Sequence, residues 1–155
     1  MQRHISYLDN LQFVRATDDT NKPHYSLEDG GIEAPVVSGF QLEGLAYSYA
    51  AIGAPFRMKT KFRGFVPVDS TVDFSVEDRR VACSLDDVEV MRAAFLEPEY
   101  RSLEATDRIL SVPFFGDEFE KRTAAYNASC DAVGVSPLLP VSFSSAALLN
   151  MGMET

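Results

Sequence analysis

Apolar and polar residues alternate along the middle of the chain. In segment 71–76 the apolar residues Val72, Phe74 and Val76 stand at every second position. Successive side chains of a β-strand point to opposite faces, so this spacing predicts a strand with one buried face. The same period recurs in neighbouring segments that are separated by turn-forming residues. The pattern predicts strands at residues 56–66, 71–76, 81–85 and 88–96.

A helical period precedes these strands. Between Pro35 and about Ala51 the apolar residues recur at helical spacing, with proline suited to the first turn and Gly53 just past the end. The pattern predicts one long, largely buried helix, in which Gly44 allows the close approach of a strand or a ligand. A helix followed by an antiparallel meander must lay the sheet against that helix, since each has an apolar face to bury. We therefore expect an α+β domain.

The two ends of the chain are less regular. Residues 11–16 are short and mixed, which fits either a strand or a helical lead-in, and a polar run follows. We expect the α+β domain to occupy residues 1–97 and a C-terminal extension to occupy residues 98–155. One interpretation of the extension is a degenerate, partial second copy of the first unit. The other, which we favour because the match is loose, is a C-terminal helix that packs on the domain or on a dimer partner.

Composition and charge narrow the function classes. The 155 residues are 46% hydrophobic and 24% charged, which is typical of one soluble domain. A basic, apolar leader is absent at the start, and so is an apolar run near the roughly 20 residues that span a bilayer, so we expect a cytoplasmic protein without membrane contact. A net charge of -9 argues against nucleic-acid binding through a broad basic face. Cys83 and Cys130 lie far apart without histidine clusters, which predicts neither a disulfide framework nor a metal site.

The candidate chemistry lies in the polar run before the expected helix. Asp19 and His24 stand five positions apart, and Gly39 follows at the helix start. An extended chain would separate the carboxylate and the imidazole by up to about 16 Å, but Asn21 and Pro23 are suited to turn the loop back. For any one of these residues alone we favour a structural role, as a cap, an Asx turn or part of the loop. Together they favour an enzyme site.

A family resemblance rests on these residues. Asp19-x-Asn21-x-x-His24, then Pro35-x-x-x-Gly39, then the segment 62–72 resemble the MaoC-like hot-dog hydratases and dehydratases, which include the (R)-specific enoyl-CoA hydratases. The resemblance covers roughly the first two thirds of the chain. It implies a hot-dog fold, in which an antiparallel β-sheet wraps a long central helix. It also implies a homodimer with the acyl tunnel at the subunit interface, and no metal or redox cofactor.

The implied activity is that of a lyase of fatty acid metabolism. Such an enzyme reversibly hydrates trans-2-enoyl thioesters, or dehydrates (R)-3-hydroxyacyl thioesters, with CoA or the phosphopantetheine of an acyl carrier protein as part of the substrate. Asp19 and His24 would hold and polarise the water, one as base and one as acid, while Asn21 orients the loop. The backbone N–H of Gly39, at a helix N-terminus, would donate to the thioester carbonyl. The other histidine, His4, is expected to be solvated near the chain start and has no role.

Three residues beside Gly39 are further candidates. Ser38 and Phe40 flank the glycine and are assigned to substrate binding. Glu43 lies one turn along the same helix face. The stretch 41–46 also resembles the central helix of the β-hydroxyacyl-ACP dehydratases, whose catalytic acid lies on that helix. We interpret Glu43 first as a supporting or exposed carboxylate and second as a catalytic acid.

Alternating cations mark the first expected strand, and they project from one face of the sheet. One hypothesis is that they meet the phosphates of CoA or of a carrier protein. The alternative, which base rates favour slightly, is a solvated outer face paired with acidic neighbours. These cations are Arg57, Lys59, Lys61 and Arg63.

Two other functions remain open from the sequence. The first is an acyl thioesterase of the same fold, in which water attacks the carbonyl instead of the β carbon. The second is a non-catalytic acyl-binding or partner subunit that keeps the fold but not the chemistry, and the C-terminal extension keeps this alternative open because it could cover the site or dock another chain.

Overall fold

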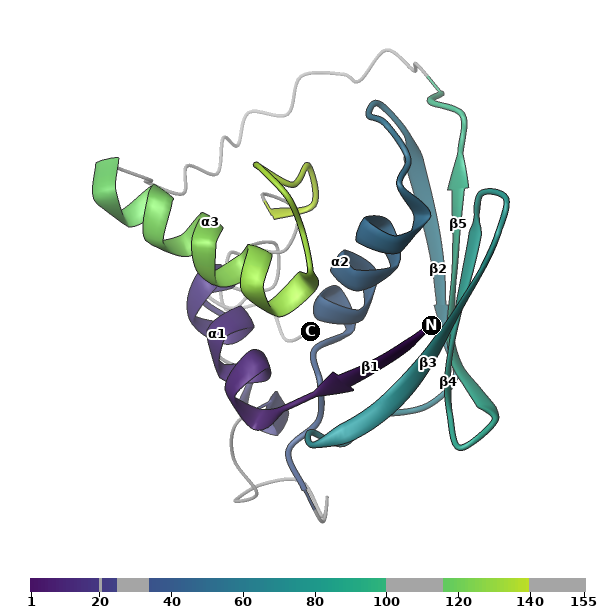
Figure 1. The fold of residues 1–155 in the computed structure, drawn as a ribbon, viewed down its shortest axis with the longest axis horizontal. Coiled ribbons are helices and arrows are strands. Elements are labelled where there is room, and N and C mark those ends of the chain that lie inside the picture. Colours follow the sequence, from purple (N-terminus) through teal and green to yellow (C-terminus); the bar gives the residue numbers. More distant parts are fainter. Residues whose placement is uncertain (20, 25–33, 100–115, 140–155) are drawn as a thin grey trace, which may run out of the picture.

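The computed structural model of the chain describes residues 1–19, 21–24, 34–99 and 116–139. Within these residues the fold is mixed α+β, with one antiparallel sheet of five strands in the order β1-β3-β4-β5-β2 (Figure 1). The strands are β1 (Gln2–Ile5), β2 (Arg57–Phe62), β3 (Ser70–Glu77), β4 (Arg80–Leu85) and β5 (Val88–Leu96). The helices are α1 (Tyr7–Thr17), the short 3₁₀ helix η1 (Lys22–His24), α2 (Gly39–Ala50) and α3 (Gly116–Cys130).

The four strands predicted from alternation are confirmed, but the first is shorter than expected, since β2 ends at Phe62 and not at Val66. β3 buries Val72 and Phe74, and β4 buries Val81 and Cys83, as a half-buried antiparallel sheet requires. The strand β1 was not predicted. It pairs antiparallel with β3, where His4 lies opposite Thr71, so the exposed histidine belongs to a strand and not to a frayed terminus. The strand has only four residues, too few for a periodic signal, and its partner lies about 70 positions away.

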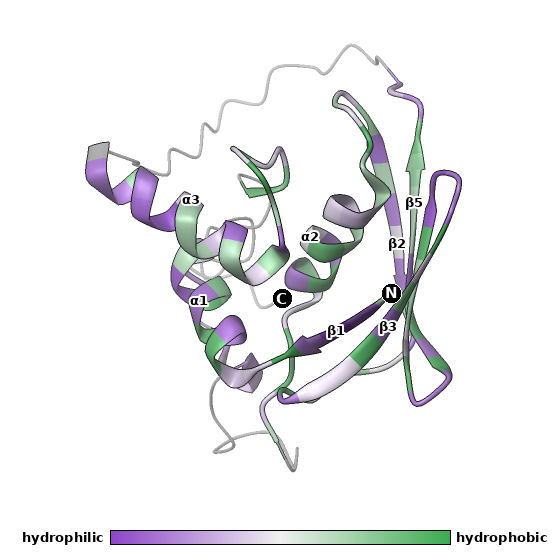
Figure 2. Ribbon diagram, viewed as in Figure 1, coloured by the Kyte–Doolittle hydropathy of each residue, from purple (hydrophilic) through white to green (hydrophobic). Residues whose placement is uncertain are grey.

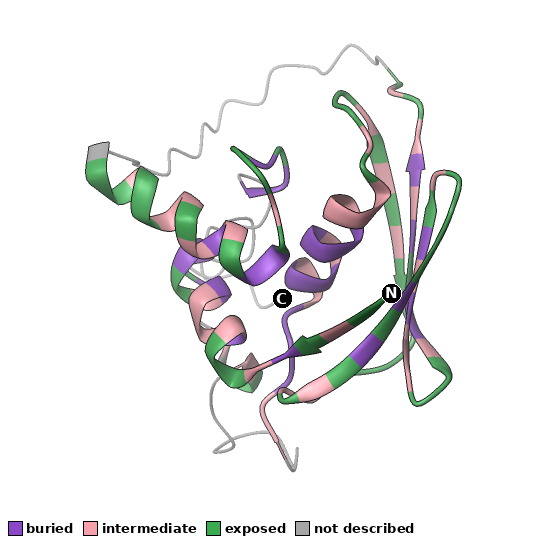
Figure 3. Ribbon diagram, viewed as in Figure 1, coloured by how far each residue is buried: buried purple, intermediate pink, exposed green. Residues whose placement is uncertain are grey.

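The helix α2 packs against one face of this sheet, and α1 and α3 lie beyond it (Figure 1). Figure 3 shows that the first turns of α2 are buried, whereas its last turn is only partly so. Leu42, Leu45 and Ala46 project from α2 into a core shared with the inner face of the strands. Apolar colour in Figure 2 is mixed with polar colour along the strands, as expected of a sheet with one solvated face.

The start of α2 differs from the prediction. A helix was expected from Pro35, but α2 begins at Gly39, and residues 35–37 are extended. The backbone N–H of Val37 donates to the carbonyl of Val66 at 2.8 Å, and Val36 forms an isolated bridge with Pro67. β-Branched residues favour extended backbone, and here long-range pairing satisfies their polar groups. The sequence identified the glycine as the helix opener correctly, while apolar spacing alone extended the helix too far.

Residues 11–16, which fitted a strand or a helical lead-in, lie inside the helix α1. Ser6 caps this helix: its hydroxyl accepts the backbone N–H of Asp9, and the Asp9 carboxylate accepts the backbone N–H of Ser6. This reciprocal arrangement is a capping box, and its Ser-x-x-Asp spacing is visible in the sequence. This spacing was not used above, but it could have identified the start of the helix from the sequence.

The helix α3 and the residues after it pack on α1 and α2 through a second apolar cluster. Gly44 of α2 faces this cluster, since a Cβ there would lie 2.7 Å from Cys130 Sγ and 2.8 Å from Tyr126 Oη. A close approach was expected at Gly44, but its partner is the helix α3 and not a strand or a ligand. The C-terminal segments that suggested a second copy are residues 115–117, 137–142 and 144–151, of which only 116–117 and 137–139 are among the described residues. The cluster comprises Phe13, Ala16, Tyr126, Cys130, Leu138 and Leu139.

None of the helices in the described part of the chain has the length and apolar character needed to cross a membrane.

Candidate functional site

Asp19 follows the C-cap residue of α1 and lies in the interior. Asp18 caps the helix in the left-handed conformation, with φ at 53°, and the N–H of Asp19 still donates to the carbonyl of Val14 at 3.1 Å. The Asp18 carboxylate pairs with Arg122 of α3 at 2.7 Å, which ties the helix end to α3. As a result, Asp18 points outward while Asp19 is only 1% exposed.

Two hydrogen bonds hold the buried carboxylate of Asp19. The hydroxyl of Ser38 donates to Oδ2 at 3.2 Å, and the backbone N–H of Asn21 donates to Oδ1 at 3.2 Å. Ser38 is the N-cap residue of α2, yet its side chain makes no capping bond to the helix. A buried charge is tolerated only when it has such partners. The loop-orienting role expected of Asn21 is thus carried by its backbone.

His24 closes the loop back onto Asp19. Its Nε2 lies 3.5 Å from Asp19 Oδ2, and its Nδ1 lies 2.9 Å from the backbone carbonyl oxygen of Val36. A carbonyl oxygen only accepts hydrogen bonds, so Nδ1 donates its N–H to Val36, and Nε2 is the ring nitrogen that faces Asp19. The side-chain amide of Asn10 donates to the His24 carbonyl and fixes the backbone. The structure therefore brings together the two residues whose approach the sequence predicted.

Gly39 begins α2 directly beside this pair. The first N–H groups of an α-helix have no acceptor within the helix, and they attract negative charge. A Cβ at Gly39 would lie 3.0 Å from Cζ of Phe62. The missing side chain therefore leaves room for the ring of Phe62, which is 47% exposed at the end of β2.

Two adjoining hollows meet at these residues, and Asn21, His24, Gly39 and Phe62 line both. One hollow, of about 430 Å³, is here called the valine hollow. The other, of about 650 Å³, is here called the acidic hollow. The valine hollow is completed by Pro23, Val36, Val37, Leu42, Gly64, Phe65 and Val66. The acidic hollow is completed by Asp19, Ser38, Phe40 and Glu43.

Glu43 adds a second carboxylate to the acidic hollow. Burial raises the pKa of Glu43 above its ordinary value of 4.5, and the hydroxyl of Thr60 on β2 opposes part of that rise. A raised pKa of this kind is frequent in functional sites, although it does not identify one alone. Phe40 lines the same hollow and also packs on the cluster between α1 and α3.

The basic stripe of β2 lies elsewhere. Arg57 pairs with Glu99, and Arg63 pairs with Glu89 at 3.0 Å, while Lys59 and Lys61 have no ion pair with any described residue. None of the stripe's side chains is among the residues that line the two hollows. The alternation predicted from the sequence holds, since Met58 packs against the core and the cations are exposed.

In the acidic hollow, sequence reasoning missed one contact and one residue. It assigned Ser38 to substrate binding but did not predict its hydrogen bond to Asp19, because no local sequence pattern connects two residues so far apart in the chain. Phe62 was missed as well, although it shares the inward face of the strand with Met58 and is apolar at an exposed strand end. That combination was the available signal.

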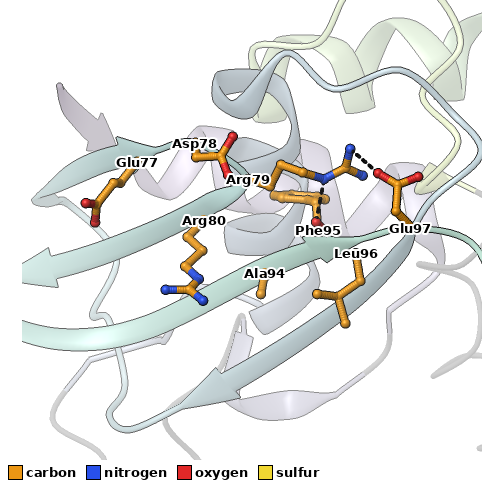
Figure 4. Close-up of a pocket in the computed structure, with 8 residues that line it drawn as sticks. All are labelled: Glu77, Asp78, Arg79, Arg80, Ala94, Phe95, Leu96 and Glu97. Atoms are coloured by element: carbon orange, nitrogen blue, oxygen red, sulfur yellow. Dashed lines mark hydrogen bonds and ion pairs between the residues drawn. The ribbon is translucent and has the colours of Figure 1, made fainter.

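A further hollow, of about 460 Å³, lies at the β3–β4 turn and the end of β5 (Figure 4). Arg79 crosses it, with Nε donating to the carbonyl of Phe95 at 2.7 Å and Nη1 lying 2.9 Å from the carboxylate of Glu97. Its lining contains neither histidine nor cysteine.

No family model matches the sequence, and no curated protein matches it. Among solved structures, the chain is similar to protein AF1124 from Archaeoglobus fulgidus, with a TM-score of 0.48 and 16% sequence identity. The alignment covers 61% of this chain and 71% of that chain.

Proposed function

We propose that this protein reversibly hydrates trans-2-enoyl thioesters, or dehydrates (R)-3-hydroxyacyl thioesters. The observation that carries the proposal is the approach of His24 Nε2 to Asp19 Oδ2, 3.5 Å apart, beside the helix start at Gly39. The side chains of both residues line a hollow large enough for a small-molecule substrate.

The reaction needs a proton moved at the α carbon and a water oxygen moved at the β carbon. The water contacts Asp19 and His24 together from the hollow; one of them removes its proton as the oxygen adds to the β carbon, and the other delivers a proton to the α carbon. On the imidazole, the proton moves at Nε2, because Val36 occupies Nδ1. The enolate oxygen that forms between these steps accepts the N–H of Gly39, where the helix dipole favours negative charge.

We also propose a hot-dog fold and a homodimer for the protein. The strand order β1-β3-β4-β5-β2 and the packing of α2 on one face of the sheet support the fold proposal. The dimer rests on the family resemblance, together with the place of β1 and β2 as the outer strands of the sheet in the described part of the chain.

The test is the loss of enoyl-thioester absorbance when purified protein meets crotonyl-CoA. We expect activity, and a loss of about 10²-fold to 10⁴-fold in kcat for the Asp19→Asn and His24→Ala variants. Circular dichroism verifies that each variant is folded. Matched controls are Asp18→Asn, which changes the neighbouring carboxylate that pairs with Arg122, and His4→Ala, which removes the other histidine. Both controls should retain activity.

Other outcomes separate the alternatives. Release of free CoA without hydration would favour the thioesterase. Binding of acyl-CoA without turnover, indifferent to both site variants, would favour a non-catalytic acyl-binding subunit. Equal losses in site variants and controls would contradict the assignment of the site to Asp19 and His24.

A further inference from the structure

The two hollows that meet at Gly39 differ in chemistry. Both reach His24 and the helix start, so a thioester carbonyl bound at the Gly39 N–H would adjoin both hollows. An acyl thioester is likewise two-sided, with an apolar chain on the carbonyl carbon and a polar, amide-bearing arm on the sulfur. The inference that follows assigns the acyl chain to one hollow and the polar arm to the other, and it rests on the proposed function.

The valine hollow fits the apolar chain. Val36, Val37, Leu42 and Val66 supply its walls, and all four belong to the buried apolar residues. Phe65 also lines this hollow and, with 78% of its surface exposed, stands at its rim. Each methylene moved from water into such walls strengthens binding by about fourfold.

The acidic hollow fits the amide-bearing arm. Beyond the shared residues it presents the carboxylates of Asp19 and Glu43 and the hydroxyl of Ser38. Asp19 is already engaged by Ser38 and Asn21, whereas Glu43 lies one helical turn from Gly39, a rise of about 6 Å. The first amide N–H of a pantetheine arm follows the sulfur after a short two-carbon link, which matches this separation. Carboxylate oxygens accept such donors.

We propose that the thioester lies across the start of α2, with its acyl chain in the valine hollow and its pantetheine arm in the acidic hollow, where Glu43 accepts an amide N–H. The acyl group is then bound within a single subunit, between α2 and the segment that follows β2. Phe65 sets the preference for chain length, and Glu43 is a binding residue for the carrier arm.

The experiment compares crotonyl-CoA with trans-2-octenoyl-CoA. Phe65→Ala should lower kcat/KM by about tenfold for the octenoyl substrate and by much less for crotonyl-CoA, because only the longer chain reaches the rim. Glu43→Leu should raise KM by about tenfold for both substrates without changing their ratio, and Glu43→Gln should restore binding because its amide oxygen still accepts. Val88→Ala is the control, since Val88 is 65% exposed and lines neither hollow.

The opposite pattern would overturn this arrangement: a chain-length effect from Glu43→Leu and an equal effect on both substrates from Phe65→Ala. Unchanged kinetics in both variants would overturn it as well. A loss of kcat in Glu43→Gln would make Glu43 a catalytic acid instead. Calorimetric binding of butyryl-CoA and octanoyl-CoA to the same variants repeats the comparison without turnover. If the wild-type protein binds them with the expected pattern but hydrates no enoyl thioester, the proposed function fails and the binding arrangement stands.

Discussion

Ser38 illustrates how a single side chain is committed to the site. The N-cap position usually directs a serine hydroxyl to the helix backbone. Here the hydroxyl donates instead to Asp19 Oδ2, and the helix start loses its side-chain cap. A hydrogen bond to a charged, buried group contributes more to stability than a neutral one. The Ser38 hydroxyl therefore fixes the Asp19 carboxylate and leaves the start of α2 without a side-chain cap.

The Ser38→Ala variant tests this contact. Removing the hydroxyl leaves Asp19 with one fewer donor, and we expect the free energy of unfolding to fall by about 1.5–3 kcal/mol. Urea denaturation measures the change. The control is Ser48→Ala, whose hydroxyl donates to the carbonyl of Gly44 within the same helix and should contribute less. An equal or larger loss in the control would contradict the role of the Ser38 hydroxyl as a partner of the carboxylate.

The raised pKa of Glu43 predicts a pH-dependent cost to stability. In the unfolded chain this carboxyl titrates near 4.5, whereas in the folded protein it titrates higher because burial disfavours the charge. Between these two pKa values the folded state binds more protons than the unfolded state, so stability falls as pH rises through that window. The Glu43→Gln variant lacks this term and should be more stable than the wild type at about pH 7, with the difference shrinking towards about pH 4.

Denaturation curves at both pH values measure that difference. Glu120→Gln on α3 is the control, since it removes the same charge from an exposed position. A gain in the control as large as that of Glu43→Gln would assign the effect to net charge and not to burial.

Among the elements, the pair α2 and α3 shows why a glycine inside a helix is retained. Glycine costs about 1 kcal/mol of helix propensity relative to alanine. At Gly44 the side-chain ends of Cys130 and Tyr126 occupy the space of the missing Cβ, and both residues are fully buried. The close approach lets α3 lie against α2 and complete the second apolar cluster.

Gly44→Ala should therefore destabilise the protein despite the gain in propensity. Overpacking a buried contact costs about 1–3 kcal/mol, whereas replacing glycine by alanine in a helix gains about 1 kcal/mol. The cost therefore exceeds the gain over most of this range. Thermal unfolding measures the change. Gly53→Ala is the control, because a Cβ there meets nothing within 4 Å. A neutral or stabilising Gly44→Ala would show that α3 shifts away from α2 without cost.

At the scale of the whole molecule, β2 limits how two copies can meet, since it is an outer strand of the sheet that the described residues form. In the proposed dimer with one extended sheet, antiparallel pairing of two β2 strands would bring Lys59 and Lys61 of one copy close to those of the other. Like charges on paired strands repel, and lysine on an edge strand discourages pairing. Each copy also carries a net charge of -9. Both effects oppose association at low salt.

The proposed dimer should therefore strengthen with ionic strength. The screening length falls from about 30 Å at 0.01 M salt to about 10 Å at 0.1 M, which weakens both repulsions. Sedimentation equilibrium at the two salt concentrations measures the dissociation constant. Replacing Lys59 and Lys61 by glutamine should tighten the dimer at low salt if β2 forms the interface. A monomer at every salt concentration would contradict the proposed dimer.

The sequence alone determined those features that depend on neighbours along the chain. Alternation in segments such as 71–76 and 81–85 identified the strands, because the period of two is set by the backbone itself. Gly39 was identified as the helix opener. The capping box at Ser6 was equally local and could have identified α1.

Only the tertiary structure decided which distant groups meet. The bond from Ser38 to Asp19, the pairing of β1 with β3 and the contact of Phe62 with Gly39 all join residues far apart in sequence. The extended backbone at Val36 belongs to the same class, since its bridge to Pro67 overrode a helical pattern. The physical reason is that a residue's local preference is worth a few tenths of a kcal/mol to about 1 kcal/mol, which burial and long-range hydrogen bonds readily exceed.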